Sequence, residues 1–557
     1  MSEDETAYVF KPHERGLLPG SPATPEHPTN RRLAYVLIGS LVGLTGGLGN
    51  ALGSVNLTSI AGGLELDTAQ SAWFSTVYVM TNVSMSLLLV KFRQQFGLIP
   101  MIRIFLPFYA LVTLGHVFVH GFATALIVRG LSGIAASALS SVGLLYLIQG
   151  MPAKWRLKGI VLGIGIPQLA TPLARMFSPE LLEYSQWHTL YVFEFGLALL
   201  SLAAVGALRL PPSERIKAFE PLDAVSFPLY AVGVGMLSAV LGLGRTEWWV
   251  EARWMGYTLC GAIALLAAAI AIEHNRANPL LNIRWMASAD VLRFAAVAVS
   301  VRVLLSEQGV GAVGLLTSLG MTNDQYVTLF AVVTLATVAG LIASALTVNP
   351  LKLGWPIMFS LALIAVGSVL DSDATNLTGP DNLYFSQALI AFAAIFFMGP
   401  TLLIGILRAM VKGPNHLVSF SAIFSITQSV GGLAGAAGLG SFQILRERFH
   451  SEMLVQTIVP TDPTVAGALQ QYGGAYGPVI GDPVLRQAQG AALLSQQVSR
   501  EANILAWNDV FMLIAALSIA SLLFWGLWLL RVRRSGVHPM AEPLAALARM
   551  RGSAGGN

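Results

Sequence analysis

Charged residues are scarce in this chain of 557 residues, of which 11% are charged and 55% are hydrophobic. A typical soluble domain carries about 25% charged residues. The shortage coincides with many apolar runs of about 20 residues, the length that crosses a bilayer as a helix. The sequence therefore predicts an all-α polytopic membrane protein surrounded by a lipid bilayer. In such a protein the net charge of +4 indicates Lys and Arg retained on the cytoplasmic side rather than a nucleic-acid partner.

Cysteine and the patterns of metal or nucleotide sites are also nearly missing from the sequence. The one cysteine, Cys260, lies in an apolar run, which excludes an internal disulfide and a thiolate metal site. The histidines are scattered without His-Glu-x-x-His spacing, so we expect no metal. Glycine-rich runs such as "GLTGGLGNALG" lack a Gly-Lys-Ser/Thr ending, so we expect no nucleotide or other cofactor. Inside apolar spans such glycines are typical of close helix packing.

The apolar runs divide into fourteen expected spans. An even number places both termini on one side, and the basic loops "KFRQQF", "KWRLK" and "RVRR" favour the cytoplasm for that side. The first 30 residues are polar and Pro-rich without an apolar core, so we expect a disordered tail and no signal peptide. The expected spans are 34–61, 73–90, 101–120, 122–150, 158–174, 189–208, 225–243, 254–272, 292–317, 325–347, 354–370, 383–407, 416–440 and 508–530.

One external segment, 441–507, is much longer than the other connections. Its ends, "FQILRERFHSEML" and "AALLSQQVSREANIL", mix apolar and charged residues at helical spacing, which predicts amphipathic helices. Between them lies a Gly/Pro-rich middle, "YGGAYGPVIGDP". The segment either carries a function or is a solvated loop, and the sequence leaves both readings open.

Several motifs occur together in one order along the chain. The run "IVRGLSG" places Arg129 and Gly133 in an Arg-x-x-x-Gly signature, and "WHTLYVFEFG", "LDAVSFPLYAVGVGMLSAVLGLGRTEWW" and "ANPLLNIRWM" follow it. The pair "TQSVGGLAGAAGLGSFQILRERFHSEML" and "REANILAWNDVFML" ends the series. Together they resemble the fourteen-span drug/proton antiporters of the major facilitator superfamily, of the EmrB/QacA type.

The resemblance implies the major facilitator fold, with two six-helix bundles, two linker spans and both termini in the cytoplasm. We therefore expect the division that follows. It comprises a cytoplasmic tail (1–33), an N-terminal bundle (34–208), a linker with two extra spans (209–290), a C-terminal bundle that includes 441–507 (291–531), and a second cytoplasmic tail (532–557).

The chain departs from the family pattern at its gate loop. Between the second and third spans the family usually carries Gly-x-x-x-Asp-Arg-x-Gly-Arg, a charge relay thought to hold the inward gate. Here the loop reads "VKFRQQFGLIP", with Gln94 at the place of the Asp and Val90 at the place of the first Gly. The first span also lacks the family's early carboxylate, and the fifth lacks its Gly-Pro pair. The chain resembles a divergent member.

Two charges in the N-terminal half fall inside expected spans. An ionised group in the bilayer costs about 2.5–3.5 kcal/mol on insertion scales, so one that persists usually faces a cavity or a partner. By resemblance, Arg129 is the arginine associated with proton coupling; alternatively it only hydrogen-bonds backbone carbonyls. Glu194, in the sixth span, is a second coupling candidate, although snorkelling or a structural partner explains it as well.

Arg302 and Glu307 lie near the middle of the run 292–317, in "VSVRVLLSEQG". In an ideal helix they differ by about 7.5 Å in height and about 140° around the axis, so each needs a partner on another helix. Glu307 is the better proton carrier because burial disfavours an ionised carboxylate, whereas arginine stays charged. Arg302 either influences Glu307 or receives an anionic substrate. The alternative is an interhelical ion pair that only holds the bundle together.

Polar and aromatic residues elsewhere are candidates for a mixed apolar and polar substrate cavity. Packing or lipid-facing roles explain each of them equally well. Besides Arg302, the candidates are Gln168, Gln428, Trp73, Tyr78 and Phe424.

The resemblance implies proton-driven export of amphipathic toxic small molecules across a bacterial inner membrane by alternating access. It also implies that 441–507 meets a periplasmic membrane-fusion adaptor and an outer-membrane channel. A dedicated exporter of one metabolite, such as a siderophore or a lipid precursor, is the alternative. A membrane enzyme or sensor is a further rival, but no clustered catalytic constellation occurs, so we expect no enzyme.

Overall fold

The computed structural model describes residues 14, 20–276, 278–349, 353–459, 461–535 and 545. Within these residues thirteen helices are long and apolar enough to cross a membrane. The one β feature in the same ranges is an isolated bridge between Pro22 and Ser213. Helices suit the apolar runs because a helix satisfies its own backbone hydrogen bonds, which lipid cannot do. The all-α membrane fold expected from the sequence is confirmed.

The first half of the chain forms one group of helices around a shared apolar core. Glycines let α1 and α5 approach closely. A Cβ on Gly39 would lie 3.0 Å from the carbonyl oxygen of Gly143, which is tighter than ordinary contact. The helices of this half are α1 (Thr29–Val55), α2 (Leu57–Gly63), α3 (Thr68–Phe96), α4 (Leu98–Gly115), α5 (Phe122–Gly150), α6 (Arg156–Gly165), α7 (Ala170–Ser185) and α8 (His188–Ala207).

Two linker helices and a second group complete the molecule. The linker helices α9 and α10 pack on each other, and α9 also packs on α3. The linker comprises α9 (Asp223–Leu243), α10 (Arg253–His274) and the short α11 (Ile283–Met286). The second group comprises α12 (Ala289–Leu304), η6 (Glu307–Ala312), α13 (Val313–Ser318), α14 (Val327–Thr347), α15 (Gly354–Asp371), α16 (Tyr384–Lys412), α17 (Pro414–Thr457), α18 (Pro463–Gly474) and α19 (Pro483–Ser535).

The expected span 292–317 is not one continuous helix, and this prediction is corrected. The α12 helix ends at Leu304, and η6 is a π-helical segment that begins at Glu307 and leads into the six-residue α13. Two glycines, Gly309 and Gly311, lie within η6. Single π turns inside helices are often found at functional sites. The break therefore marks Glu307 as a residue of interest.

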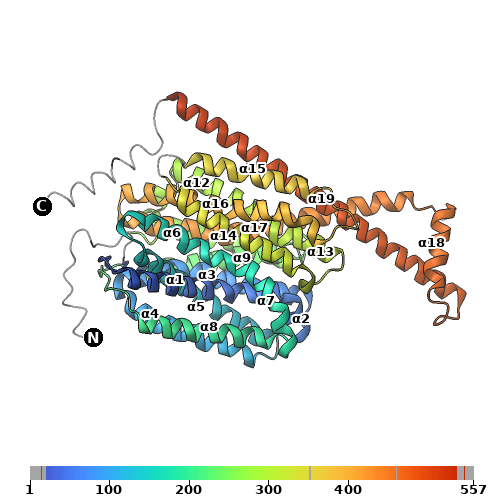
Figure 1. Cartoon of the computed structure of the whole chain (residues 1–557), viewed down its shortest axis with the longest axis horizontal. Helices are drawn as coiled ribbons and strands as arrows, with labels where there is room; N and C mark the ends of the chain where they lie inside the picture. The colour runs from blue at the N-terminus through green and yellow to red at the C-terminus, as the bar shows by residue number, and fades with distance from the viewer. Residues whose placement is uncertain are drawn as a thin grey trace.

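Two helices extend far beyond the bundle. The α17 helix has 44 residues and α19 has 53, which correspond to about 66 and 80 Å at 1.5 Å per residue, against about 30 Å of hydrocarbon. Together with α18, which packs on α19, they form the projection at the right of Figure 1. We call residues 441–507 the extension. The helical ends predicted for it are present, and the Gly/Pro-rich stretch connects α18 to α19.

The start of α1 and the end of α19 lie at the same end of the bundle, which we call the basal end (Figure 1). The extension projects from the opposite, distal end. At the basal end residues 20–28 are not a disordered tail as expected. The Ala23 N–H donates to the Pro212 carbonyl at 2.9 Å, and Arg156 donates to the Thr24 carbonyl at 2.9 Å. The segment therefore packs across the ends of the helices.

Candidate functional site

Arg129 is fully buried in α5. Its Nη1 donates to the Gly49 carbonyl on α1 at 2.9 Å. The guanidinium carbon lies 4.7 Å from the ring centres of both Phe74 and Tyr78 on α3. Its Nε and Nη2 have no hydrogen-bond partner among the described residues. Two aromatic faces therefore supply much of the environment of this buried cation, and two of its donor atoms remain unused.

Glu194 lies on the other side of Gly49. Its Oε1 accepts a hydrogen bond of 2.6 Å from the Tyr109 hydroxyl, while Oε2 has no partner in the described part of the chain. A Cβ on Gly49 would lie 2.4 Å from the Tyr109 oxygen and 2.9 Å from Glu194 Oε1. Only a glycine at position 49 leaves room on α1 for the side chains of Tyr109 and Glu194. The fold thus brings the two N-terminal coupling candidates, Arg129 and Glu194, to one point of α1.

A histidine that spacing did not single out joins this cluster. His116 is buried, and its ring stacks on Tyr191 with the ring centres 3.9 Å apart. The Nε2 atom of His116 and the hydroxyl of Tyr191 have no partner in the described ranges. No sequence motif indicated this pair, because a single histidine at the end of an apolar run has no distinguishing spacing.

Glu307 lies in the second group of helices. It is fully buried at the start of η6, and its Oε1 accepts 2.9 Å from Nε2 of Gln387 on α16. The same nitrogen donates 2.8 Å to Oδ2 of Asp371, the last residue of α15. The second oxygen of Glu307, Oε2, has no partner within the described residues. Two buried carboxylates thus share one amide donor.

Asp371 and Gln387 were missed by sequence reasoning. Asp371 lies one residue beyond the expected span 354–370, and the structure makes it the last residue of α15. Two ionised carboxylates beside one donor repel each other in a medium of low dielectric. A proton on either one removes the repulsion and supplies a new donor. The arrangement is suited to holding a single exchangeable proton.

Arg302 does not pair with Glu307, in agreement with the helix geometry. Its Nε donates 3.0 Å to the Gln428 carbonyl on α17, its stem lies against Gly431, and its guanidinium lies against Gly432. With Phe424 and Gln428 it lines a narrow cavity of about 10 Å³. That volume holds about one water molecule. Three of the predicted cavity residues are therefore brought together, in a closed arrangement.

The other predicted cavity residues lie elsewhere. Gln168 is exposed on η5 (Ile166–Leu169). Trp73 stacks on Trp254 of α10, with ring centres 6.1 Å apart. Tyr78 lies under Arg129. The structure thus divides the six residues expected to line one cavity among four places.

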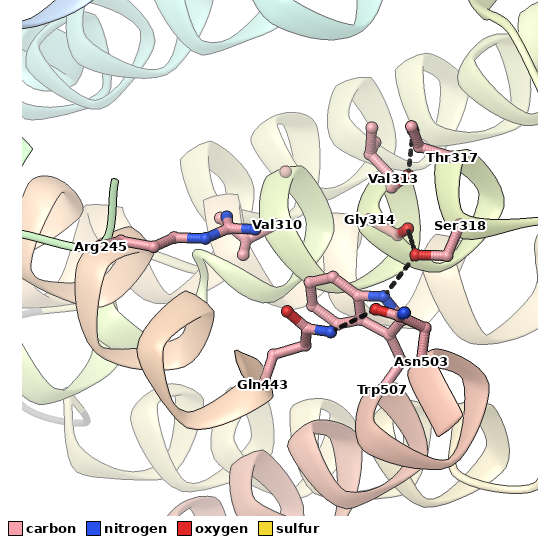
Figure 2. A pocket seen from close by; sticks show the side chains of 10 residues that line it. Arg245, Val310, Val313, Gly314, Thr317, Ser318, Gln443, Asn503 and Trp507 are labelled. Atoms are coloured by element: carbon pink, nitrogen blue, oxygen red, sulfur yellow. Dashed lines mark hydrogen bonds between the residues drawn. The ribbon is translucent and has the colours of Figure 1, made fainter. Parts of the chain in front are cut away.

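A larger pocket, of about 290 Å³, opens at the distal end (Figure 2). The interrupted span, the roots of the extension and the loop after α9 all contribute to it. We call it the distal pocket. Its lining residues are Arg245, Gly309, Val310, Val313, Gly314, Thr317, Ser318, Gln443, Asn503 and Trp507.

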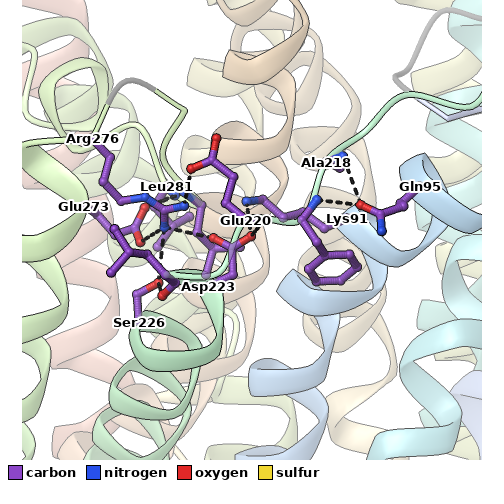
Figure 3. Close-up of polar contacts among 12 residues, drawn as sticks. Lys91, Gln95, Ala218, Glu220, Asp223, Ser226, Glu273, Arg276 and Leu281 are labelled. Carbon is purple, nitrogen blue, oxygen red and sulfur yellow. Dashed lines mark hydrogen bonds and ion pairs between the residues drawn. The ribbon is translucent and has the colours of Figure 1, made fainter.

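A buried charge cluster occupies the basal end, where the gate loop departs from the family pattern (Figure 3). Lys91 Nζ on α3 lies 2.7 Å from Asp223 Oδ2 on α9. Arg276 contacts Asp223 at 2.8 Å, Glu273 at 2.7 Å and Glu220 at 2.9 Å. The hydrogen bond from Arg276 lowers the pKa of Glu220 below its usual range. The cluster ties the second span to both linker helices.

The linker also contacts the second group of helices. The Asn282 N–H donates 2.9 Å to Oγ of Ser419 on α17, and the Asn282 side chain lies 3.1 Å from His416. The linker is thus attached to both halves of the molecule at the basal end.

Comparison with known proteins shows what the chain resembles. No family model matches the chain. It is 22% identical over 492 residues to the multidrug export protein EmrB of Haemophilus influenzae, covering 84% of this chain and 90% of that protein. The resemblance covers nearly the full length of both.

Solved transporters share the fold. A bacterial homologue of the human drug peptide transporters PepT1 and PepT2 superposes with a TM-score of 0.55, at 11% identity, over 90% of this chain and 99% of that one. The human organic anion transporter MFSD10 superposes with a TM-score of 0.52, at 14% identity, over 88% and 100%. The chain therefore has the fold of these transporters and is similar over most of its length to a multidrug export protein. The thirteen long apolar helices of its described residues make it a multi-pass membrane protein, and the proteins that it resembles are transporters.

Proposed function

We propose that this major facilitator exports amphipathic small molecules in exchange for protons by alternating access. The observation that carries the proposal is the buried carboxylate pair of Glu307 and Asp371 on one amide nitrogen. One oxygen of the pair, Oε2 of Glu307, has no hydrogen-bond partner among the described residues, and the pair lies beside the interruption of a span. Similarity to a multidrug export protein supports the class of cargo. Arg129 and Glu194, beside Gly49, are the proposed second part of the coupling machinery.

The direction of transport follows from the proposed orientation. Lys and Arg gather in the basal loops, which supports a cytoplasmic basal end and an external distal end in a bacterial inner membrane. A proton from outside would bind the carboxylate pair and leave on the cytoplasmic side, while cargo moves outward through the region of Arg302, Gln428 and Phe424. The proposed bundles remain 34–208 and 291–531, with the linker 209–290 between them.

Proton-driven flux in proteoliposomes tests the proposal. Glu307→Gln keeps an oxygen that accepts from Gln387 but cannot exchange a proton, so export driven by a pH gradient is expected to fall to background. Glu452→Gln, an exposed position on the extension, is the matched control and should transport like wild type. Unimpaired gradient-driven export by Glu307→Gln contradicts the assignment.

A dedicated exporter of a single metabolite is the second candidate. The narrow cavity at Arg302 and the eroded gate loop at Gln94 favour it, because both suit one cargo rather than many. Growth of a deletion strain and its complemented parent on a broad panel of toxic compounds separates the two. Protection against several unrelated compounds supports multidrug export, whereas protection against one supports the dedicated exporter.

The extension supports a proposed partner. Its helices rise well beyond the bundle, and by similarity to EmrB we propose that it meets a periplasmic adaptor that leads to an outer-membrane channel. Co-purification with an adaptor, compared between the wild type and a chain lacking 461–482, tests this partner.

A further inference from the structure

The distal pocket is built from three separated parts of the chain. One wall is the interrupted span, through Val310 and Val313, and the opposite wall is Trp507 of α19. Figure 2 shows Arg245, from the loop after α9, extending along the pocket toward Val310. No carboxylate is among the residues that line it. Arginine is therefore the one charged group at this site.

The structure holds Arg245 in position without neutralising it. No hydrogen bond or ion pair joins its guanidinium to another of the described residues. Its stem and one side of its guanidinium lie on α17, where a Cβ on Gly440 would come within 2.5 Å of Arg245 Cδ, 2.8 Å of Nε and 2.9 Å of Nη1. The loop is fastened nearby, because Trp249 Nε1 donates 2.7 Å to Oγ of Ser441. The guanidinium donors that do not face α17 therefore remain available at a defined place.

The other polar groups satisfy one another and leave an apolar face. Trp507 Nε1 donates 2.9 Å to Ser318, and Gln443 donates 2.8 Å to Asn503. These bonds fix the indole and the amides at the wall. The two valines, which are partly exposed, then offer an apolar surface within reach of the cation, and the nearly buried indole lies beside them. A site with one cation, an aromatic wall and few other polar groups suits an amphipathic anion.

We propose that the distal pocket binds a small organic anion, with its acid group on Arg245 and its apolar body along Val310 and Val313, beside Trp507. The volume of about 290 Å³ lies at the lower end of the range for small-molecule sites, so the ligand is small. The inference rests on the proposed export function and adds a substrate class and an external site on the exit side. Val310 belongs to the same π-helical segment as Glu307, so the ligand would contact the element that carries the proposed proton site.

Equilibrium binding of 2-naphthoate tests the proposal. The probe combines a carboxylate with a flat apolar body, and neutral 2-naphthamide is its matched partner. Calorimetry on the full-length protein in lipid nanodiscs is expected to show binding of naphthoate and at least about tenfold weaker binding of naphthamide. Arg245→Gln should weaken naphthoate binding about tenfold or more, since a charge-assisted hydrogen bond is lost.

Two further variants separate a specific contact from general effects. Gly440→Ala keeps the charge but displaces the Arg245 stem, so it should also weaken naphthoate binding. Arg253→Gln removes an equal charge from an exposed position at the start of α10, which does not line the pocket, and should bind naphthoate like wild type. The proposal is overturned if wild type does not bind naphthoate, if naphthamide binds equally well, or if Arg245→Gln and Arg253→Gln behave alike.

The outcome is independent of proton coupling, because binding is measured without a gradient. Glu307→Gln should retain naphthoate binding. If the protein shows no gradient-driven export but naphthoate binding still depends on Arg245, the proposed export function is wrong and the anion site is retained. If export is proton-driven but naphthoate binding does not depend on Arg245, the proposed anion site is wrong and the proposed export function is retained.

Discussion

Glu307 and Asp371 accept hydrogen bonds from one atom, Nε2 of Gln387, at 2.9 and 2.8 Å. The two carboxylates come from a π-helical segment and from the end of α15, and the amide that joins them belongs to α16. Any movement of these elements relative to one another changes the distance between the charges. A proton bound to the pair would therefore depend on the arrangement of the helices, as alternating access requires.

The first prediction concerns the partner carboxylate. In Asp371→Asn one of the two carboxylates is gone, and with it the repulsion between them. The pH at which gradient-driven export is half-maximal should therefore shift by about one pH unit or more. Flux in proteoliposomes measured across a pH series checks this. An unchanged pH profile would show that Asp371 does not act on Glu307.

The second prediction concerns Gly49. In Gly49→Ala the new Cβ would meet the Tyr109 oxygen at 2.4 Å and Glu194 at 2.9 Å, so one of them has to shift. Overpacking of this kind costs about 1–3 kcal/mol, and we expect a lower melting temperature together with impaired proton coupling. Gly196→Ala is the control, because its Cβ would meet no atom within 4 Å. Equal melting temperatures and flux for the two variants would contradict the prediction.

The third prediction concerns the basal charge cluster. Asp223→Asn leaves Lys91 and Arg276 buried without their shared acid. Breaking a buried pair costs about 3–5 kcal/mol, so thermal unfolding in detergent should shift strongly to lower temperature. Asp290→Asn is the matched control, because its ion pair with Arg293 is exposed and contributes at most about 1 kcal/mol. Comparable shifts for Asp223→Asn and Asp290→Asn would show that the cluster does not fasten the linker.

The sequence predicted the helical architecture well for a physical reason. Lipid requires long apolar runs, so each span can be identified from the composition of its segment. The composition also identified Arg129, Glu194 and Glu307 as candidates, because a charged residue inside an apolar run is easily recognised. The ideal helix angle also predicted that Arg302 and Glu307 have separate partners.

The remaining parts of the site had no comparable signal. Asp371 stands at the end of an apolar run beside other acids, where it is typical of a loop. Gln387 is neutral, and Lys91 belongs to a basic loop that the positive-inside rule already explains. The π-helical break at Glu307 leaves the apolar pattern unchanged, since it alters hydrogen bonding rather than composition. These features depend on which helices meet, and only the tertiary structure determines that.

The last prediction concerns the root of the extension, where Asp509 on α19 joins two residues of α17. Its Oδ2 accepts 2.6 Å from Nε of Arg446 and lies 2.6 Å from Nε2 of His450. In Asp509→Asn both contacts lose their charge, and the projecting ends of α17 and α19 should separate more easily. Limited proteolysis should therefore cut within 441–507 several-fold faster than in wild type, with little change in the melting temperature of the membrane-embedded bundle.

Glu452→Gln, exposed on the same extension, controls for loss of one negative charge and should be cut at the wild-type rate. Equal cleavage rates for Asp509→Asn and wild type would show that α18 and the packing of α17 on α19 hold the extension without this contact.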